Sequence, residues 1–441
     1  MEIKRNIEQQ LFAWKNKPNR KPLVLQGARQ VGKTWILKHF GGKNFENVAY
    51  FNFDEQADLK PFFAQTKDVK RIIDYLSLVN GTAILAEKTL IIFDEIQECN
   101  DALNSLKYFQ ENAPEYAVVC AGSLLGVAMS RGASFPVGKV DFLTVHPVSF
   151  SEFLSVAAPP LLDYLHNIKL IEPIPDIFFN QLVEVFKRYY ISGGMPEAIV
   201  ALIEYQDIEM TQTVISNILN AYRLDFSKYT ENHLIPKITH VWNSIPSQLA
   251  RENKKFIYQV VKSGARAREY EDALLWLENA GLVYRIFNCN KPALPLSSYD
   301  DLSAFKVYLS DVGLLRRMSA LDPIAIREGN RLFVEFKGAL TENFILQSLV
   351  LQFEEMPRYW TSGNQAEIDF IVQYQNDIIP IEVKADENVA GKSMIIYEKQ
   401  FHPKVRIRYS LKNLKNDGNL INIPLFMVDY TKTILESYFQ E

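Results

Sequence analysis

The feature that most constrains this chain is an eight-residue run, 27–34, that fits the pattern G-x-x-x-x-G-K-T. It follows the apolar segment 23–25 and opens onto a helix-like segment from Trp35. A strand, a glycine loop and a helix in this order form a cradle for phosphate groups, because the loop N–H groups and the positive helix end point at the ligand. The pattern predicts binding of ATP or GTP. The residues expected to contact the nucleotide are Gly27, Ala28, Arg29, Gln30, Val31, Gly32, Lys33 and Thr34.

Two residues of this loop have specific expected roles. Lys33 is predicted to reach the β- and γ-phosphates and so to act in catalysis, and the Thr34 hydroxyl is predicted to hold Mg²⁺. No N-K-x-D run, which would read guanine, follows the next acidic strand, so ATP is preferred over GTP.

Composition sets the frame for the rest of the chain. With 441 residues, of which 48% are hydrophobic, the chain has room for about three domains. A net charge of -4 provides no global basic field for a nucleic acid or an acidic membrane. Cys99, Cys120 and Cys289 lie far apart, which argues against a disulfide framework or a zinc site. With no apolar run of about 18 residues and no leader-like start, we expect a cytoplasmic protein without a membrane partner.

An acidic strand end supplies the second half of the predicted nucleotide site. Residues 90–95 form a continuous apolar run that ends in Asp94 and Glu95, as in a strand buried on both faces of a parallel sheet. Asp94 is the expected Mg²⁺ partner of Thr34, and Glu95 is the expected group that polarises the attacking water. The alternative is a solvated strand end. Ser123 ends a third buried run, 116–123, and is expected either to sense the γ-phosphate or to be an ordinary turn residue.

The middle of the chain, 186–290, has helical periodicity followed by a strand at 282–286. A helix, a stop at Gly281 and a strand indicate a winged helix. The segment 251–270 carries six basic and two acidic residues. Such a segment fits a DNA groove, and it fits equally well the solvated face of a lid or of a protein-binding module.

A group of polar residues recurs in the C-terminal third. Glu342 shares a helix face with apolar residues, so its carboxylate needs a partner there. Two strands, 366–372 and 379–384, place Asp369, Glu382 and Lys384 at one end of a sheet. Glu342, Asp369 and Glu382 are predicted ligands of Mg²⁺ or Mn²⁺, and Lys384 is predicted to activate water for phosphodiester attack. The alternative is a surface ion pair between Glu382 and Lys384.

With these residues the chain resembles bacterial P-loop ATPases of AAA type that carry a C-terminal domain of unknown function related to PD-(D/E)XK nucleases. The resemblance runs over nearly the full length and implies nucleotide-driven conformational work. It rests on 27–34, 93–95, 122–123, 147–153, 193–197 and the C-terminal motifs.

The chain departs from this family at one position. Relatives carry Gly-Arg shortly before the Pro-x-Ser-Phe stretch, whereas this chain has Gly138-Lys139. Lysine keeps the charge but loses the planar fork of arginine. An arginine that acts on the γ-phosphate is therefore unassigned. The candidates are Arg131, Arg188 and Arg223, or an arginine of another copy or of a protein partner.

The predicted fold class is α/β in three parts. A P-loop ATPase with a parallel sheet occupies 1–185, a helical and winged-helix region occupies 186–290, and a restriction-endonuclease-like domain occupies 291–441. The predicted function is Mg²⁺-dependent ATP hydrolysis coupled to DNA binding or cleavage. The competing prediction is a nucleotide-controlled switch or scaffold whose nuclease fold does not cut. The sequence leaves open whether a homo-oligomer forms.

Overall fold

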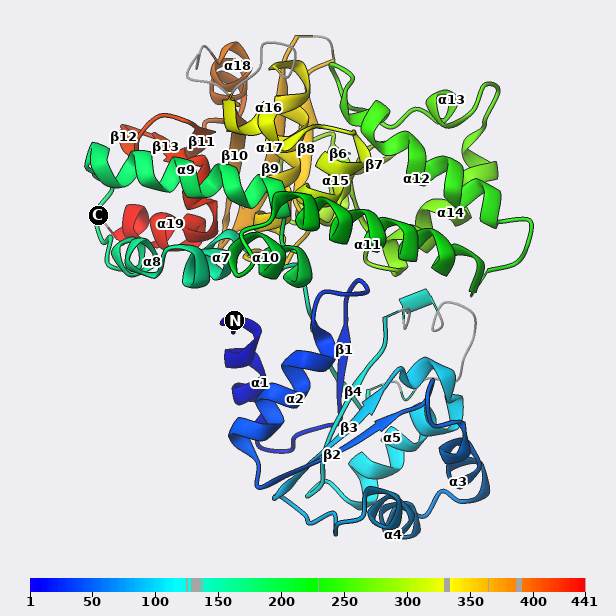
Figure 1. Cartoon of the computed structure of the whole chain (residues 1–441). Helices are drawn as coiled ribbons and strands as arrows, with labels where there is room; N and C mark the ends of the chain where they lie inside the picture. Colours follow the sequence, from blue (N-terminus) through cyan, green and yellow to red (C-terminus); the bar gives the residue numbers. More distant parts are fainter. Residues whose placement is uncertain are drawn as a thin grey trace. The chain divides into compact units, whose positions relative to one another are not determined.

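The computed structural model describes residues 1–123, 126–127, 136, 138–228, 230–328, 334–363, 365–385 and 391–440, without the side chains of 328 and 334–336. The chain divides into two units, each with its own sheet (Figure 1). The smaller unit contains Lys4–His146 and Leu275–Leu282. The larger unit contains Met1–Ile3, Pro147–Leu274 and Val283–Glu441. The smaller unit is therefore assembled from two separate stretches of chain.

The described part of the smaller unit contains a five-stranded sheet in the order β2-β3-β4-β1-β5, and all its neighbouring strands are parallel. The strands are β1 (Leu23–Gln26), β2 (Asn47–Asn52), β3 (Thr89–Asp94), β4 (Ala117–Ala121) and β5 (Asp141–Thr144). The helices are α1 (Ile7–Lys15), α2 (Lys33–Asn44), α3 (Lys60–Gln65), α4 (Val69–Asn80) and α5 (Asn100–Asn112). The side chains of 90–93 in β3 are fully buried. The predicted parallel sheet is thus confirmed.

The strand order places the predicted nucleotide residues at one edge of this sheet. The glycine loop joins β1 to α2, and β4 lies between β1 and β3. Because the strands are parallel, the carboxyl ends of β1, β4 and β3 meet at the same edge, where open α/β sheets bind their ligands. Ser123 follows β4, and Asp94 and Glu95 stand at the end of β3.

The larger unit begins with helices and continues into a mixed sheet. Its first helices are α7 (Phe150–Ala157), α8 (Pro159–His166), α9 (Asp176–Ser192), α10 (Pro196–Ile203), α11 (Ile208–Lys228), α12 (Ile235–Leu249), α13 (Tyr258–Val261) and α14 (Ala267–Asn279). The later helices are α15 (Val312–Met318), α16 (Pro323–Glu328), α17 (Val334–Leu349), α18 (Lys392–Phe401) and α19 (Thr431–Gln440). Residues 275–279, the last part of α14, belong to the smaller unit.

In the described residues of the larger unit, the sheet has eight strands in the order β12-β13-β11-β10-β9-β8-β6-β7. The strands are β6 (Val283–Cys289), β7 (Asp300–Leu309), β8 (Arg358–Thr361), β9 (Glu367–Tyr374), β10 (Asp377–Val383), β11 (Arg406–Ser410), β12 (Lys415–Asp417) and β13 (Leu420–Pro424). Strands β9 and β10 are antiparallel, and β10 and β11 are parallel. A mixed α/β arrangement therefore stands where the restriction-endonuclease-like domain is predicted.

The units of the structure differ from the three predicted parts. The predicted boundary at 185/186 falls inside α9, and the boundary at 290/291 falls between β6 and β7, which pair antiparallel. Helices α12, α13 and α14 precede this hairpin, the order that a winged helix requires, but the hairpin continues the large sheet. Periodicity locates helices and strands but carries no information on which strands pair, so the three predicted parts stay a prediction.

Within the described residues, every helix is too short or too polar to cross a bilayer.

Candidate functional site

The glycine loop of the smaller unit has a backbone that requires glycine. Gly27 has φ +136°, and a Cβ atom there would lie 2.1 Å from the Val145 carbonyl oxygen. Gly32, directly before α2, has φ +94°, in the left-handed region that favours glycine. Gln30 also has a positive φ of 65°. Ala28 and Val31 are buried, and Arg29 is half-buried. The loop is therefore held tightly, with its turn pressed against the end of β5.

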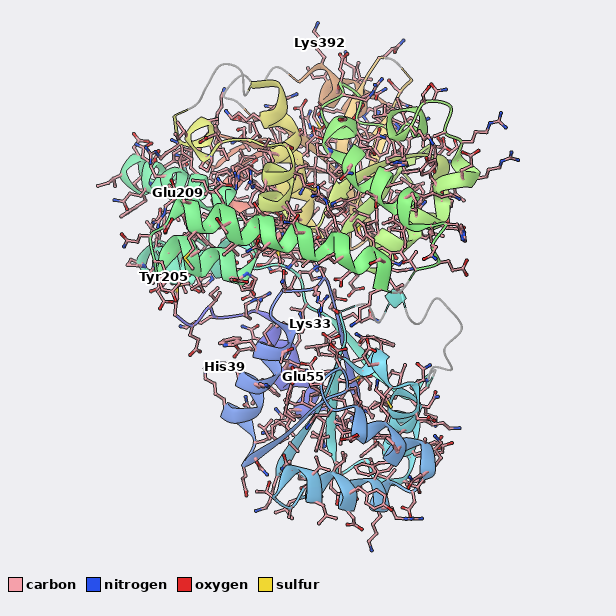
Figure 2. All side chains as sticks on the ribbon, turned by 45° about the vertical axis from the view of Figure 1, so that its right-hand side comes forward. Lys33, His39, Glu55, Tyr205, Glu209 and Lys392 are labelled. Carbon is pink, nitrogen blue, oxygen red and sulfur yellow. The ribbon has the colours of Figure 1, made fainter. Side chains whose placement is uncertain are left out.

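Lys33 is the first residue of α2 and is labelled in Figure 2. Its ammonium group donates hydrogen bonds to the carbonyl oxygens of Gly27 (2.9 Å) and Ala28 (2.7 Å). Burial lowers the pKa of Lys33 to about 8, although the nearby carboxylates of Glu95 and Asp94 oppose this shift. The ammonium group thus lies over the loop, where a phosphate would supply the missing counter-charge.

Thr34 and Asp94 lie together, as the sequence predicts for a magnesium site. The Thr34 hydroxyl donates a 2.6 Å hydrogen bond to Asp94 Oδ2. The same oxygen accepts a 2.9 Å hydrogen bond from the Tyr50 hydroxyl on β2. Asp94 is 4% exposed. A hydroxyl and a carboxylate oxygen are hard donors that fit the Mg²⁺ of a bound nucleotide.

Glu95 and Ser123 are also brought together. Glu95 has a φ of +48°, which is uncommon for a residue with a side chain. Its Oε2 accepts a 3.3 Å hydrogen bond from the Ser123 hydroxyl and another from Gln97. A carboxylate held by two donors at this sheet edge has the chemistry to orient a water molecule.

Arg5 is a structural support of the loop that sequence reasoning did not identify. Its guanidinium donates to the carbonyl oxygens of Val31 (3.0 Å) and His146 (2.7 Å), and thereby ties the loop to the end of the sheet. Gly281 lies beside the loop as well, because a Cβ atom there would be 3.1 Å from Ala28 N. Neither contact has a local sequence signal, since the partners are far apart in the chain.

The predicted arginine candidates stay a prediction. Arg131 lies outside the described residues. Arg188 stands on α9 and Arg223 on α11, both in the larger unit. Lys139, which stands where relatives carry arginine, forms a 2.8 Å ion pair with Glu111.

In the larger unit, β9 and β10 bring two of the predicted C-terminal residues together. The register pairs Ile381 with Phe370, so Glu382 stands opposite Asp369 one step further along. Glu382 is 2% exposed. Its carboxylate contacts Lys384 Nζ at 3.1 Å and Arg408 Nε at 3.1 Å. Asp369 Oδ2 instead accepts a 2.7 Å hydrogen bond from the Val383 N–H.

Glu342 has the buried partners that its place on an apolar helix face requires. Lys254 lies 2.6 Å from its Oε1, and the Tyr308 hydroxyl donates to its Oε2 at 3.0 Å. Lys306, which is fully buried, forms an ion pair with Glu367 nearby. These lysines were not predicted to contact the acids, although Lys254 lies in the basic stretch 251–270.

The lysines control the charge state of the neighbouring acids. Burial alone raises the pKa of Glu342, but Lys254 and Lys306 outweigh this effect and hold the pKa below its ordinary value. Burial raises the pKa of Asp369 to about 7, with a further increase from Glu342 that the two lysines only partly offset. The cluster is thus an ion-pair network in which ammonium groups neutralise carboxylates.

The C-terminal acids do not fit the predicted divalent cation in this arrangement. Glu342 faces Lys254, and Glu382 faces Lys384 and Arg408. Among the described residues, no group of three or more His, Cys, Asp or Glu side chains is arranged to hold a metal ion. The three predicted ligands are therefore held separately. Glu342 contacts Lys254, Glu382 contacts Lys384 and Arg408, and Asp369 accepts from the Val383 N–H.

A cleft of about 1020 Å³ lies beside this network. Its basic lining residues are Arg251, Lys254, Lys255 and Lys384, and its acidic ones are Glu252, Asp301, Glu367 and Asp369. The stretch 399–415, further along the chain, carries six basic residues. Four of its basic side chains pair with acids: Lys404 with Asp377, Arg406 with Glu398, Arg408 with Glu382 and Lys415 with Asp417.

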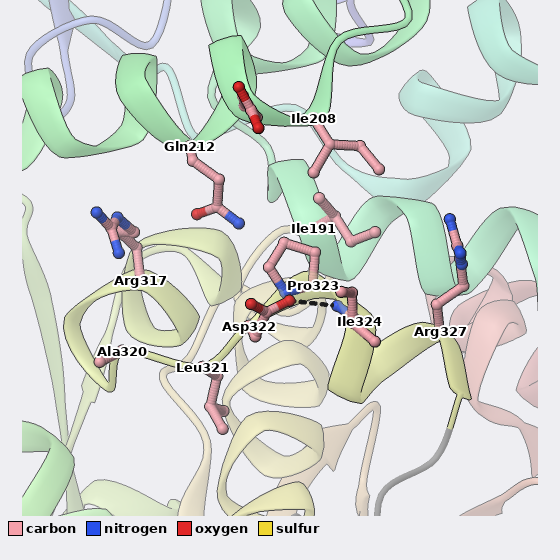
Figure 3. A pocket seen from close by; sticks show the side chains of 11 residues that line it. Ile191, Ile208, Gln212, Arg317, Ala320, Leu321, Asp322, Pro323, Ile324 and Arg327 are labelled. Carbon is pink, nitrogen blue, oxygen red and sulfur yellow. Dashed lines mark hydrogen bonds between the residues drawn. The ribbon is translucent and has the colours of Figure 1, made fainter.

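A second cavity, of about 550 Å³, lies in the larger unit between α9, α11, α15 and α16 (Figure 3). Gln212 and Arg317 lie on one side of it and Arg327 on the other, with Asp322 between them. None of the residues predicted for the nucleotide or C-terminal site lines this cavity.

Comparisons with known families assign the N-terminal part of the chain. Residues 19–154 match the model of a family described as an AAA domain. Residues 183–325 and 337–426 match two families described as domains of unknown function, DUF8612 and DUF4143. No curated protein matches the chain. The AAA match and the parallel sheet with its glycine loop support a P-loop fold of AAA type for the N-terminal part. The likeness to PD-(D/E)XK nucleases stays a prediction.

The solved structures that resemble this chain share little sequence identity with it. The Walker-type ATPase of Pyrococcus abyssi is 13% identical, with a TM-score of 0.44, over 72% of this chain and 96% of that chain. The Orc1 protein of Aeropyrum pernix in complex with DNA is 13% identical, with a TM-score of 0.28, over 74% and 92%. The RuvB Holliday junction branch migration motor of Thermotoga maritima is 12% identical, with a TM-score of 0.29, over 66% and 90%. At TM-scores below 0.5 these likenesses carry no inference about function.

Proposed function

We propose that the protein is an ATPase that binds Mg²⁺-ATP on the loop 27–34 and hydrolyses it at the edge formed by β1, β4 and β3. The loop N–H groups and the N-terminal end of α2 receive the phosphates. The Lys33 ammonium group leaves the Gly27 and Ala28 carbonyl oxygens and binds the β- and γ-phosphates. Mg²⁺, held by Thr34 and Asp94, neutralises charge on the phosphate oxygens when it is bound.

Two further residues act on the water molecule. Glu95 accepts a hydrogen bond from the attacking water and aims it at the γ-phosphorus. Ser123 keeps the Glu95 carboxylate in place through its 3.3 Å hydrogen bond. Because Glu95 is not needed to bind the phosphates, its loss should stop hydrolysis more than binding.

The 2.6 Å contact between Thr34 and Asp94 is the observation that carries this proposal. The two residues are separated by 60 positions, and their side chains meet beside the loop only because β3 ends at the same edge as β1. A chance G-x-x-x-x-G-K-T run would not place an acid from another strand on its threonine.

The test is a comparison of nucleotide binding and turnover in three proteins. Wild type should bind Mg²⁺-ATP and release phosphate. Lys33→Ala should lose binding, and Glu95→Gln should bind ATP but lose at least about 100-fold in turnover, the range that one general base supplies. Failure of wild type to bind ATP in the presence of Mg²⁺ would refute the proposal.

A second proposal concerns the C-terminal part. We infer that it acts as a nucleotide-controlled binding module and does not cleave DNA. The pairing of Glu342 with Lys254 and of Glu382 with Lys384 and Arg408 supports this choice. We take DNA as the partner because the exposed side chains of Arg251 and Lys255 line the adjoining cleft, although four acids line it as well. DNA should raise ATP turnover without being nicked. Mn²⁺-dependent nicking that Asp369→Ala abolishes would instead favour the nuclease.

A further inference from the structure

The cavity of about 550 Å³ in the larger unit has the size and the lining of a small-molecule site (Figure 3). Such sites usually enclose about 300–1,000 Å³ and combine apolar walls with a few converging polar groups. Six of the eleven described residues that line this cavity are apolar, among them Ile191 of α9 and Ile208 of α11. The polar groups of the lining therefore decide which ligand the cavity accepts.

Arg316 of α15 fixes which end of the Gln212 amide faces the cavity. Arg316 is fully buried, and its Nη2 donates a 2.9 Å hydrogen bond to Gln212 Oε1. Because a guanidinium group only donates, Gln212 must turn its oxygen to Arg316 and its NH₂ group elsewhere. Figure 3 shows the Gln212 side chain reaching into the cavity, and no described residue accepts a hydrogen bond from this NH₂ group. Two N–H donors are thus available to a ligand.

Arg317 adds further donors beside this amide. Its Nε donates a 2.8 Å hydrogen bond to the hydroxyl of Ser216, one helical turn after Gln212 on α11. Residues four apart share a helix face, so the guanidinium group and the amide lie on the same wall of the cavity. Within the described part of the chain, neither Nη group of Arg317 has an acceptor. The wall therefore presents a planar fork of N–H groups, which matches the two oxygens of a carboxylate.

The charges around the cavity do not balance. Arg317 and Arg327 line it, and Arg316 lies directly behind its wall. The acids of the lining are Glu209 and Asp322, so three positive charges stand against two negative ones, a formal sum of +1. Burial lowers the pKa of Arg316 to about 10, with a further decrease from Arg317 that nearby acids only partly offset. A monoanion would complete the charge balance, whereas a doubly charged phosphate ester would exceed it.

We propose that this cavity binds a small organic monoanion whose carboxylate is held by the Arg317 guanidinium and the Gln212 NH₂ group. The carboxylate receives charge-assisted hydrogen bonds from Arg317, and the apolar body of the ligand packs against Ile191 and Ile208. The cavity shares no residue with the predicted nucleotide site or the C-terminal acids. The proposal therefore holds whether or not the smaller unit hydrolyses ATP.

The first test compares three probes with the same alkyl chain: hexanoate, hexanamide and hexyl phosphate. Their dissociation constants for the full chain are measured by saturation-transfer difference NMR. Hexanoate should bind at least about tenfold more tightly than hexanamide, because only hexanoate accepts charge-assisted hydrogen bonds on both oxygens. The absence of saturable hexanoate binding, or equal binding of hexanamide, would overturn the proposal. Tighter binding of hexyl phosphate at this cavity would overturn the assignment to a carboxylate.

The variant Gln212→Glu locates the bound probe and guards against misfolding. The new carboxylate still accepts the hydrogen bond from Arg316, so the protein should melt at the same temperature or higher. The new side chain lacks the NH₂ donors and repels an anion, so hexanoate should bind at least about tenfold more weakly. Only probe binding that Gln212→Glu removes is assigned to the cavity, which separates it from phosphate binding at the loop 27–34.

A second substitution tests the guanidinium group. Arg317→Gln should also weaken hexanoate binding at least about tenfold, because the planar fork and its charge are lost. Arg223→Gln is the matched control, since Arg223 is exposed on the same helix as Gln212 but does not line the cavity. It should bind hexanoate like wild type. Unchanged hexanoate binding in Gln212→Glu or in Arg317→Gln, with cooperative melting of that variant, would overturn the proposal.

Discussion

The Tyr50 hydroxyl donates a 2.9 Å hydrogen bond to Asp94, on the same carboxylate oxygen that Thr34 contacts. The two residues stand on the neighbouring parallel strands β2 and β3. The Tyr50 ring in turn carries the Lys38 ammonium group 3.5 Å from its centroid. Tyr50 therefore fixes the orientation of the carboxylate that we expect to support Mg²⁺.

Tyr50→Phe should weaken the use of Mg²⁺ without abolishing ATP binding. Loss of one hydrogen bond of about 1 kcal/mol leaves the Asp94 carboxylate free to rotate, so the Mg²⁺ concentration for half-maximal turnover should rise roughly fivefold. The measurement is ATP turnover across a Mg²⁺ titration. Tyr75→Phe is the control, because the Tyr75 hydroxyl bonds Arg71 on the surface of the same unit. An unchanged Mg²⁺ midpoint in Tyr50→Phe would contradict this role.

Gly27→Ala should destabilise the smaller unit and remove ATP binding. The new methyl group would meet the Val145 carbonyl oxygen at 2.1 Å, on a backbone with φ +136°. Overpacking of this kind costs about 1–3 kcal/mol. Gly42→Ala in α2 is the control, because no atom lies within 4 Å of a Cβ there. It should stabilise by about 0.5–1 kcal/mol. Equal melting temperatures for the two variants would rule out the close approach.

The stability of the nucleotide-free protein should depend on pH through Lys33. Burial lowers its pKa from 10.5 to about 8 in the folded state. Between pH 8 and 10.5 the unfolded chain holds a proton on Lys33 that the folded chain lacks. The Lys33 contribution to the free energy of unfolding therefore rises with pH over this range. It is lost as the pH falls back to about 8. The full effect is on the order of 3 kcal/mol.

Urea unfolding of wild type and Lys33→Met at several pH values between 7 and 10 checks this sign. The difference in unfolding free energy, wild type minus variant, should increase with pH, since all other groups titrate in both proteins. A difference that stays flat over this range would show that the Lys33 pKa is not lowered.

Arg408→Ala should cost more stability than the loss of a surface ion pair. Among the described residues, it leaves the carboxylate of Glu382, which is 2% exposed, with Lys384 as its remaining ion-pair partner. Breaking one partner of a buried pair costs about 3–5 kcal/mol, and we expect about 2–3 kcal/mol because Lys384 stays. Lys404→Ala removes the exposed pair with Asp377 and should cost at most about 1 kcal/mol. Denaturant unfolding measures both, and a smaller loss for Arg408→Ala would contradict the pairing.

The sequence was sufficient for the parts of the fold whose signals are local. The run 27–34 carries the glycines that its loop backbone requires, and the apolar run 90–93 is typical of a strand buried on both faces. The chain therefore predicted the glycine loop, the parallel sheet and the meeting of Thr34 with Asp94. Strands 366–372 and 379–384 were likewise recognisable from their alternation.

The missed contacts are those that depend on pairing between distant segments. Tyr50 reaches Asp94 because β2 pairs with β3, a register that no local pattern encodes. Lys254 is 88 positions from Glu342, and Lys306 is 61 positions from Glu367. A buried acid on an apolar helix face signalled that Glu342 needed a partner, but the signal did not say whether a metal or an ammonium group would supply it.

Residues 275–282 belong to the same unit as the loop 27–34, although more than a hundred residues of the larger unit separate them from His146 in the sequence. Gly281, at the end of that insertion, stands within a methyl group's reach of Ala28. A fragment cut after His146 would carry the whole glycine loop but lack this buttress. A fragment that reproduces the smaller unit must therefore include both 4–146 and 275–282.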